Sequence, residues 1–232
     1  MKTRLIKLDL ETATVVKRVS RVSVLCEKEG VEALFHMTNT GRLLELIYPG
    51  ATVYVYKRKG VKTDGVVVGV DTRDGPALID TRTQSRCFEL ACERGLVPWL
   101  QPYKIVGREV KIGGSRIDYL IEAGSDAKGL MELKSAVYLD SDGAAMYPDT
   151  VSLRGRDHIM LLTGLPRKLR RIITFIAAHP AAKYFRPCDE ADPMISRLLK
   201  AAVEGGVELR SVKICLRDGA VYLEDWDLPI RL

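Results

Sequence analysis

The chain has 232 residues and a formal net charge of +6, and 47% of its residues are apolar while 28% are charged. These proportions are typical of a soluble globular protein and exclude wholesale disorder, and the length corresponds to one large domain or two small ones. No apolar stretch is long enough to cross a bilayer, and the N-terminal residues mix charged with apolar side chains, unlike a secretory signal. We therefore expect a cytoplasmic protein that does not bind membranes.

The first third of the chain has the pattern of a small β-barrel. Short runs that alternate apolar and polar side chains are separated by turns that contain glycine, as at Gly41, Gly50 and Gly65. Short strands at regular spacing indicate a barrel or a sandwich, and a stretch of this length fits a five-stranded oligonucleotide-binding (OB) barrel. Periodicity alone does not distinguish that barrel from other small ones. The strands that we predict are 14–25, 31–37, 52–57 and 66–71.

The hydrophobic period becomes that of a helix at residue 83. A helix is predicted over 83–94, where apolar residues recur at helical spacing and Gly95 ends the run. We therefore divide the chain into a barrel domain of residues 1–83 and an α/β domain of residues 84–232. The first part carries 14 basic and 10 acidic residues and the second carries 22 and 20, so the first is the more basic per residue. This excess permits a polyanionic partner.

The second part has the mixed order of an α/β domain. After the helix at 83–94 come three strands, a helix, a buried strand, a second helix and two closing strands. The last helix has Asp192 as its N-cap residue and Pro193 in its first turn, and two glycines follow its end. The predicted elements are strands 103–112, 116–122 and 128–139, helix 154–162, strand 172–178, helix 192–203 and strands 207–216 and 220–223.

Two carboxylates and a lysine on neighbouring strands are the candidate chemical groups. Because side chains alternate along a strand, Glu132 and Lys134 point to the same side, about 6–7 Å apart. If strand 116–122 pairs with strand 128–139 as a hairpin whose apolar faces are aligned, Asp118 lies on that side too. The alternatives are a partly buried salt bridge between Glu132 and Lys134, or a solvated charged face.

This arrangement has the chemistry of a divalent-metal site. The carboxylates of Asp118 and Glu132 and the main-chain carbonyl of Leu133 are hard oxygen ligands that suit Mg²⁺ or Mn²⁺. Such a metal polarises a phosphoryl oxygen and lowers the pKa of a bound water. Lys134 could hold the attacking water or offset charge that develops on a phosphate. Phosphodiester hydrolysis is therefore a reaction that these residues could support.

Motifs in several segments follow one another in chain order. Residues 109–118 fit the pattern E-x-x-x-G-x-S-R-x-D, and residues 131–135 fit V-E-V-K-S with Met and Leu in place of the valines. Further matches are residues 38–43 (P-N-T-G-R-L, preceded by His36), 147–150 (F-P-D-A), 153–158 (R-G-x-x-H) and 185–193 (F-x-P-x-x-x-x-D-P). Together these motifs resemble those of the sugar fermentation stimulation protein A family, and they are specific as a set although no single one is.

The resemblance implies an OB-type barrel followed by a domain related to the PD-(D/E)XK nucleases. It also implies DNA binding, with a link to the regulation of sugar metabolism in bacteria. By motif, Asp118, Glu132 and Lys134 are the nuclease-like triad, and Glu109 is an additional acidic contributor. The resemblance does not imply that family members cleave nucleic acid.

Two departures from the family pattern concern the barrel and the first helix. Met37 and Thr38 replace the usual Cys-Pro before Asn39, which puts the binding edge of the barrel in question. Residues 80–86 lack the asparagines that the family pattern leads us to expect near the start of the following helix. The triad itself is intact.

Basic side chains outside the triad are candidates for phosphate contacts. Lys17, Arg18 and Arg21 lie on a strand-like run that could track phosphates along a groove, or that forms an ordinary solvated face. Arg154 and His158 are four residues apart at the start of a helix, so they share a face and could contact a phosphate near the metal. The nucleic-acid-binding residues that we predict are Lys17, Arg18, Arg42, Arg116, Arg154 and His158.

Two further segments are secondary candidates. The basic loop 57–59 lies next to Tyr54 and Tyr56, which suits either single-stranded nucleic acid or an ordinary hairpin tip over two core tyrosines. Asp149 follows a proline, so it could cap a turn, and its motif position makes it a candidate support for the metal site.

The sequence leaves two classes of function in competition. The first is a DNA-binding nuclease that hydrolyses phosphodiesters with Mg²⁺ or Mn²⁺. The alternative is a non-catalytic DNA-binding regulatory protein, in which the carboxylates are inherited with the fold or bind metal only for structure. A role in processing RNA or nucleotides, the strandedness of the DNA and the formation of a homodimer stay open.

Overall fold

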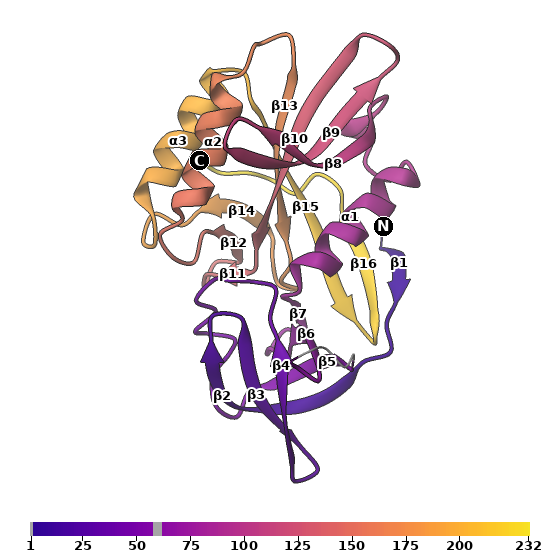
Figure 1. Cartoon of the computed structure of the whole chain (residues 1–232), viewed down its shortest axis with the longest axis vertical. Coiled ribbons are helices and arrows are strands. Elements are labelled where there is room, and N and C mark those ends of the chain that lie inside the picture. Colours follow the sequence, from indigo (N-terminus) through magenta and orange to yellow (C-terminus); the bar gives the residue numbers. More distant parts are fainter. Residues whose placement is uncertain (1, 58–61) are drawn as a thin grey trace.

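The computed structural model describes residues 2–57 and 62–232. Figure 1 shows a small β-barrel below a larger domain, in which a seven-stranded mixed sheet has helices on both faces. The predicted fold class, a small barrel followed by a mixed-sheet α/β domain, is confirmed. Arg58 and Lys59 of the predicted basic loop lie outside the described residues. No helix in the described part of the chain is long and apolar enough to cross a membrane.

Five strands, β2 to β6, close the barrel, and the short strand β7 extends it. Closure comes from a parallel contact between β4 and β6, in which Phe35 lies opposite Gly65. A side chain at Gly65 would collide with the main-chain oxygen of Tyr56, so the contact requires glycine there. The strands are β2 (Glu11–Ser20), β3 (Ser23–Lys28), β4 (Val31–His36), β5 (Thr52–Lys57), β6 (Gly65–Val70) and β7 (Ala77–Leu78).

The predicted strand 14–25 is in fact two strands. β2 and β3 form an antiparallel hairpin that turns at Arg21 and Val22. The turn contains neither glycine nor proline, so nothing in the sequence pattern marks it. The hydroxyl of Ser20 accepts a hydrogen bond from the main-chain N–H of Val22 at 3.2 Å, which stabilises the turn instead.

The first strand does not belong to the barrel. β1 (Thr3–Lys7) pairs antiparallel with β16 (Ala220–Asp225), at the edge of the seven-stranded sheet. The predicted barrel domain of residues 1–83 therefore includes a strand that lies in the other sheet. Pairing between strands at opposite ends of the chain leaves no local pattern in the sequence. The predicted domain boundary therefore did not separate β1 from the barrel. The boundary at residue 83 stays a prediction.

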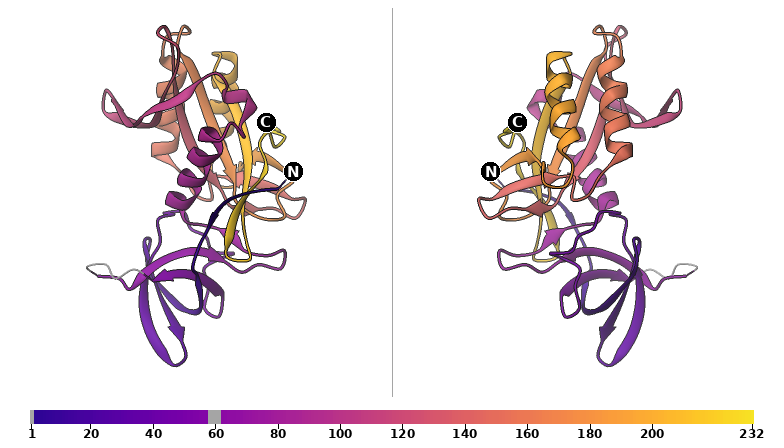
Figure 2. Two further views of the ribbon diagram at one scale, coloured as in Figure 1. Left: turned by 90° about the vertical axis from the view of Figure 1, so that its right-hand side faces the viewer. Right: turned by 90° about the vertical axis from the view of Figure 1, so that its left-hand side faces the viewer.

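The seven-stranded sheet has a parallel centre. β13 pairs in parallel with β10 on one side and with β15 on the other, and a strand buried on both faces needs a nearly continuous apolar run. Helix α1 covers one face, and α2 and α3 cover the other (Figure 2). The elements are α1 (Thr81–Glu93), β8 (Lys104–Ile112), β9 (Ser115–Ala123), β10 (Ala127–Ala136), α2 (Leu153–Gly164), β13 (Arg170–Ala177), α3 (Pro193–Glu204) and β15 (Glu208–Arg217).

A second, three-stranded sheet was not predicted. Its strands have two to four residues, too few to show an alternating pattern. The predicted strand 128–139 is consequently divided, because β10 ends at Ala136 and a new strand begins at Tyr138. The remaining elements are β11 (Tyr138–Leu139), β12 (Ala144–Tyr147), β14 (Tyr184–Pro187) and the short 3-10 helix η1 (Pro98–Leu100).

The barrel and the α/β domain share one apolar core. A single cluster of buried side chains includes Val53 of the barrel, Phe88 of α1 and Val212 of β15. Polar contacts add to it: the hydroxyl of Thr38 donates to Asp80 at 2.7 Å, and Asp80 is the N-cap residue of α1. The start of α1 is therefore held against a loop of the barrel.

Candidate metal and nucleic-acid site

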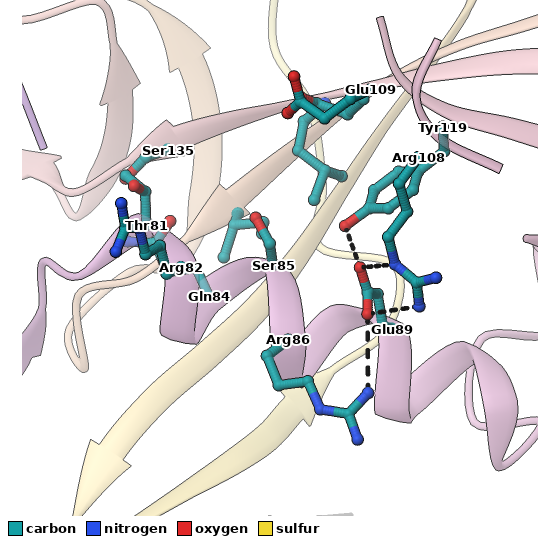
Figure 3. Close-up of a pocket in the computed structure, with 13 residues that line it drawn as sticks. Thr81, Arg82, Gln84, Ser85, Arg86, Glu89, Arg108, Glu109, Tyr119 and Ser135 are labelled. Atoms are coloured by element: carbon teal, nitrogen blue, oxygen red, sulfur yellow. Dashed lines mark hydrogen bonds and ion pairs between the residues drawn. The ribbon is translucent and has the colours of Figure 1, made fainter. Parts of the chain in front are cut away.

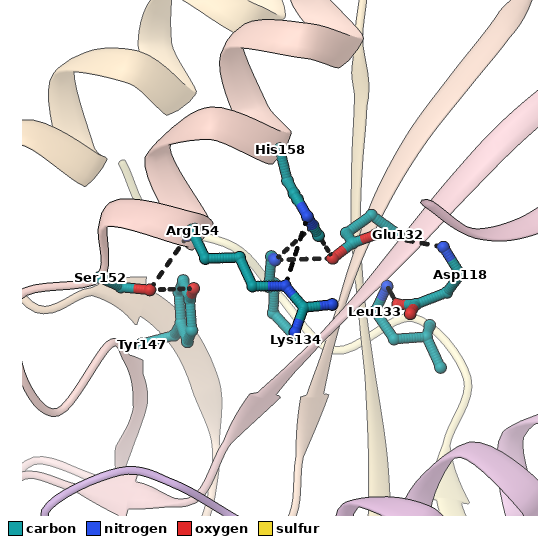
Figure 4. Close-up of polar contacts among 9 residues, drawn as sticks. Asp118, Glu132, Leu133, Lys134, Tyr147, Ser152, Arg154 and His158 are labelled. Atoms are coloured by element: carbon teal, nitrogen blue, oxygen red, sulfur yellow. Dashed lines mark hydrogen bonds and ion pairs between the residues drawn. The ribbon is translucent and has the colours of Figure 1, made fainter. Parts of the chain in front are cut away.

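The candidate site forms where β9 and β10 separate. The two strands pair until Met131 lies opposite Tyr119, and the next opposed residues are Glu132 and Asp118. At that point, carboxylates replace main-chain carbonyls as the hydrogen-bond acceptors between the two strands. Asp118 Oδ2 accepts from the N–H of Leu133 at 2.7 Å, and Glu132 Oε2 accepts from the N–H of Asp118 at 3.2 Å. Each acid is therefore held by the main chain of the neighbouring strand (Figure 4).

Lys134 and His158 lie against the other oxygen of Glu132. Lys134 Nζ donates to Glu132 Oε1 at 2.7 Å, and His158 Nδ1 bonds with the same oxygen. Figure 4 shows His158 reaching from α2 toward Glu132, with Arg154 beside it; Arg154 Nε is 3.5 Å from His158 Nε2. The Glu132–Lys134 salt bridge that the sequence left as an alternative is therefore present, and both of its side chains also line a cavity.

Burial and neighbouring charges shift the pKa of each predicted catalytic group. Burial and the charge of Glu132 raise the pKa of Asp118 to about 6. Burial also acts to raise the pKa of Glu132, but hydrogen bonding and charge from His158 and Lys134 outweigh it and lower this pKa. Burial acts to lower the pKa of Lys134, but Tyr147 and Glu132 outweigh it and raise this pKa. The two acids therefore face the ammonium of Lys134 and the imidazole of His158, and Asp118 is the acid whose ionisation the site disfavours.

Two cavities meet at the carboxylates. One, of about 590 Å³, lies between barrel residues 39–41 and residues 147–155 of the α/β domain. The other, of about 440 Å³, is lined by α1 and by β8 and β9 (Figure 3). The residues that line both cavities are Thr81, Asp118, Leu133 and Ser135. The two cavities therefore adjoin at the predicted metal ligands.

The residues at this junction fit a divalent cation. Among the described residues, Oδ1 of Asp118 has no hydrogen-bond partner, and it lies beside the carboxylate of Glu132. In residues 2–57 and 62–232 no three His, Cys, Asp or Glu side chains gather around one point. A cation here would find two carboxylates and the main-chain carbonyl of Leu133, and water or substrate would complete its ligands. Mg²⁺ suits such a site because it usually keeps several of its waters.

Two of the predicted nucleic-acid-binding residues, Arg18 and Arg42, donate to main-chain carbonyls, and Arg42 reaches the α/β domain. The Arg18 guanidinium donates to the main-chain carbonyls of Arg42 and, at 2.7 Å, of Gly41. Arg42 Nε donates to the carbonyl of Asp149 at 3.0 Å, and the Asp149 carboxylate accepts from the N–H of Leu43 at 2.9 Å. Carbonyls of the loop therefore already occupy donors of Arg18, and its contact with nucleic acid stays a prediction. Asp149 connects the α/β domain to the same loop.

The other predicted contacts are distributed unevenly. Arg154 lines the 590 Å³ cavity, whereas Lys17 and Arg116 are exposed and line neither of the two cavities. His158 is only 3% exposed and lies behind Glu132, because the buried face of α2 turns its ring toward the sheet. That position does not leave His158 free to contact a phosphate.

Glu109, the predicted additional acid, lies at the rim of the 440 Å³ cavity. Its side chain is exposed and is 3.8 Å from Arg116, and its negative charge contributes to the raised pKa of Asp118. Its participation in metal binding stays a prediction.

The structure adds two cations that the sequence analysis did not assign to the site. Arg82 and Arg86 of α1 line the 440 Å³ cavity, on the side of Asp118 away from Arg154. Their spacing of four residues places them on one face of a helix, which the sequence could have indicated. That this face borders Asp118 follows only from the packing of α1 on the sheet.

Comparisons with known proteins support the resemblance seen in the sequence. Residues 82–219 match the family model for the sugar fermentation stimulation protein RE domain, and residues 16–79 match that for the SfsA N-terminal OB domain. The chain is 41% identical over 199 residues to a sugar fermentation stimulation protein homolog of Pyrococcus furiosus, with 85% of each chain covered. It is 37% identical over 216 residues to the homolog of Archaeoglobus fulgidus, with 93% of each covered.

A solved structure extends this similarity to three dimensions. The structure of Pyrococcus furiosus SfsA in complex with Ca²⁺ superposes with a TM-score of 0.94 at 36% sequence identity, and the match covers 99% of this chain and 100% of that one. From the order of its motifs, its two matched domains and its fold, the chain belongs to the sugar fermentation stimulation protein family.

Proposed function

We propose that this protein is a metal-dependent phosphodiesterase that acts on DNA. Asp118, Glu132 and the main-chain carbonyl of Leu133 would hold Mg²⁺ or Mn²⁺, and Lys134 would orient the attacking water. One observation carries the proposal: two carboxylates and a buried ammonium from adjacent strands converge on the wall of a groove.

The electrostatics of the junction support cation binding. The raised pKa of Asp118 marks the place where a divalent cation would favour the ionised acid, and every available ligand atom is an oxygen. The homologous Pyrococcus furiosus protein was solved in complex with Ca²⁺, which prefers the same kind of ligand. A divalent cation bound here would polarise a phosphoryl oxygen and lower the pKa of a bound water.

The side chains around the carboxylates have separable roles. Lys134 Nζ is held by Glu132 and lies 5.9 Å from the ring centre of Tyr147, so it is fixed at the cavity wall, where it can donate to water or to a phosphate oxygen. His158 binds the same oxygen of Glu132, which makes it a positioning residue. Arg154, exposed at the first turn of α2, is placed to hold a phosphate.

DNA is the polyanion that we propose as the partner. The N-terminal domain belongs to an OB family, and OB barrels bind oligonucleotides through one face and its neighbouring loops. Barrel residues 39–41 and Arg21 line the same cavity as Glu132, which brings the barrel to the carboxylates. The strandedness of the DNA, a cytoplasmic location and a homodimer stay predictions.

The proposal is tested by replacing one carboxylate without changing its shape. Plasmid and single-stranded DNA are incubated with the wild-type protein and with Asp118→Asn, in Mg²⁺ or Mn²⁺. We expect the variant to lose at least about 100-fold in cleavage rate, since it removes a charge from the reacting centre. Titration calorimetry with Ca²⁺ and Mn²⁺ provides a second readout, in which the variant should bind more weakly.

The matched control is Asp126→Asn, which removes the same charge from the exposed turn between β9 and β10. It should cleave DNA and bind cations like the wild type. Equal cleavage by all three proteins would mean that the activity comes from a contaminant, and catalysis at Asp118 would be abandoned.

The second candidate is a non-catalytic DNA-binding regulatory protein. The buried contacts of Glu132 with Lys134 and His158 favour it, because they resemble a satisfied structural network. In that case the wild type should bind DNA with an affinity that falls steeply as salt rises, yet cleave nothing in any divalent cation. Competition among single-stranded DNA, duplex DNA and RNA identifies the preferred polyanion. Absence of binding even at low salt would remove both candidates.

A further inference from the structure

We infer that the substrate strand continues past Asp118 in both directions, so that the protein cuts within a strand, and that Arg82 and Arg86 hold phosphates on one side of the cut. This inference rests on the proposed function, because it concerns the same carboxylates. It assigns a role to the α1 surface, which the chemistry proposed above does not use.

The first support is the shape of the site. Asp118 and Leu133 line both cavities, so space for a chain extends to either side of them. An enzyme that removes nucleotides from an end needs space for the chain on one side only. Two cavities that meet at the carboxylates, here called the two arms of the site, therefore suit cleavage of a bond in the middle of a strand better than cleavage at its end.

The second support is that both arms carry cations. The 590 Å³ arm is lined by Arg21, Lys134 and Arg154. The 440 Å³ arm is lined by Arg82 and Arg86, while its acids besides Asp118, namely Glu89 and Glu109, lie next to Arg108 and Arg116 respectively. A strand carries a negative charge at every phosphate, so a path that accepts it should be basic on both sides of the reacting bond.

The third support is that these two arginines make few contacts that stabilise the fold. Among the described residues, Arg82 has no hydrogen bond or ion pair. Arg86 is 55% exposed and lies 3.7 Å from Glu89 and 3.8 Å from Glu93, distances too long for direct hydrogen bonds. Exposed pairs of this kind contribute little to stability, so Arg86 can exchange them for a phosphate.

Glu89 does not depend on Arg86 for compensation. Arg108 donates to both oxygens of the Glu89 carboxylate at 2.9 Å, and the Tyr119 hydroxyl donates to one of them at 3.0 Å (Figure 3). Burial acts to raise the pKa of Glu89, but hydrogen bonds from Arg108 and Tyr119, the charge of Arg108 and, least of all, the charge of Arg86 outweigh it and lower this pKa. The acid is thus satisfied from β8 and β9, and the α1 arginines stay available on the cavity side.

The experiment compares DNA with and without ends. Wild-type protein is given closed circular single-stranded DNA, closed circular plasmid and end-labelled linear DNA, with Mn²⁺. Cutting within a strand predicts that a circular substrate is opened, and that linear DNA first yields internal fragments of many lengths. Release of only mononucleotides or short ends from linear DNA, with both circles intact, would overturn the inference and leave the proposed function standing.

The role of α1 is tested with Arg82→Gln/Arg86→Gln. Its matched control is Arg197→Gln/Lys200→Gln, which removes two exposed cations from α3, away from both cavities. Without a divalent cation, the α1 variant should bind DNA about tenfold or more weakly, and its plot of log binding constant against log salt should be shallower by about 2. The α3 variant should match the wild type in both respects.

Two outcomes separate the failures. An α1 variant with the wild-type salt slope would overturn the phosphate contacts of Arg82 and Arg86. No cleavage of any substrate by the wild type would overturn both the inference and the proposed function. If the double variant folds poorly, Arg82→Lys/Arg86→Lys is used instead, because it keeps both charges. This variant should keep most of the salt slope. A large loss of salt slope in it would also count against the phosphate contacts.

Discussion

Two buried charged clusters of the α/β domain differ in what surrounds them. Arg171 is 3% exposed, and its guanidinium donates to main-chain carbonyls after the ends of α2 and α3, including Leu165 and Gly205, both at 2.9 Å. Glu132 and Lys134 are almost as buried, yet their side chains border a cavity. Burial of a charge therefore does not by itself indicate a functional site. A buried charge beside a cavity is the more informative sign.

The largest expected effect comes from removing the buried guanidinium of Arg171. Arg171→Met should lower the free energy of unfolding by about 3 kcal/mol or more, because buried carbonyls at two helix ends lose their donor. Urea denaturation followed by circular dichroism measures the change. Arg167→Met, an exposed residue of the same basic segment, should change stability little. DNA cleavage per folded molecule should be the same in both variants, and a selective loss of cleavage in Arg171→Met would contradict a purely structural role.

The next effect concerns the cluster of Glu132 and Lys134 and distinguishes the roles of these two residues. Lys134→Met should reduce cleavage by about 100-fold, because the water or phosphate loses a donor. The same change makes the cluster more negative, so Ca²⁺ should bind at least as tightly as in the wild type. Glu132→Gln removes the opposite charge and should weaken Ca²⁺ binding. If calorimetry shows that both variants lose Ca²⁺ alike, the variants are disrupting the fold of the site rather than its separate charges.

A smaller effect, on pH dependence, comes from a third buried group. His179 is 5% exposed; burial lowers its pKa from 6.5 to about 4, which the charge of Asp74 only partly opposes, and its Nδ1 accepts from the N–H of Ala181 at 3.2 Å. The unfolded chain therefore takes up a proton at a higher pH than the folded one. Stability should fall as pH drops from 6.5 toward 4, by about 1–2 kcal/mol between pH 7 and pH 5 from this group.

Thermal unfolding of His179→Gln and of the wild type across that pH range measures this dependence. The variant should show a shallower decline, since glutamine does not titrate. Parallel curves for the two proteins would mean that other groups dominate the acid sensitivity and that His179 is not the main acid-sensitive group.

The sequence was sufficient for the central pairing of the site. Alternation along two strands predicted that Asp118, Glu132 and Lys134 share one side, and the structure brings the three together at 2.7–3.2 Å through shared partners. Strand alternation is a local property that depends only on backbone geometry, so it can be read without knowing the fold. The family motifs independently selected the same three residues.

The contacts that the sequence did not reveal all depend on packing between distant segments. His158 was placed at the right end of α2, but only the docking of that helix on the sheet shows that its ring faces Glu132. Arg18 looked available for phosphate until the loop at Gly41 supplied its acceptors. In both cases the residue type was informative about chemistry and uninformative about which partner would satisfy it.

The edge strand β1 has a mechanical consequence. Because Thr3–Lys7 is hydrogen-bonded into the large sheet, the chain leaves that sheet, builds the barrel, and returns to it at α1. The barrel is thus an insertion connected to the α/β domain at two points rather than by one linker. Rotation of the barrel about a single hinge would have to break the pairing of β1 with β16. A cleft whose opposite walls come from the two parts can in this way keep its width before any substrate arrives.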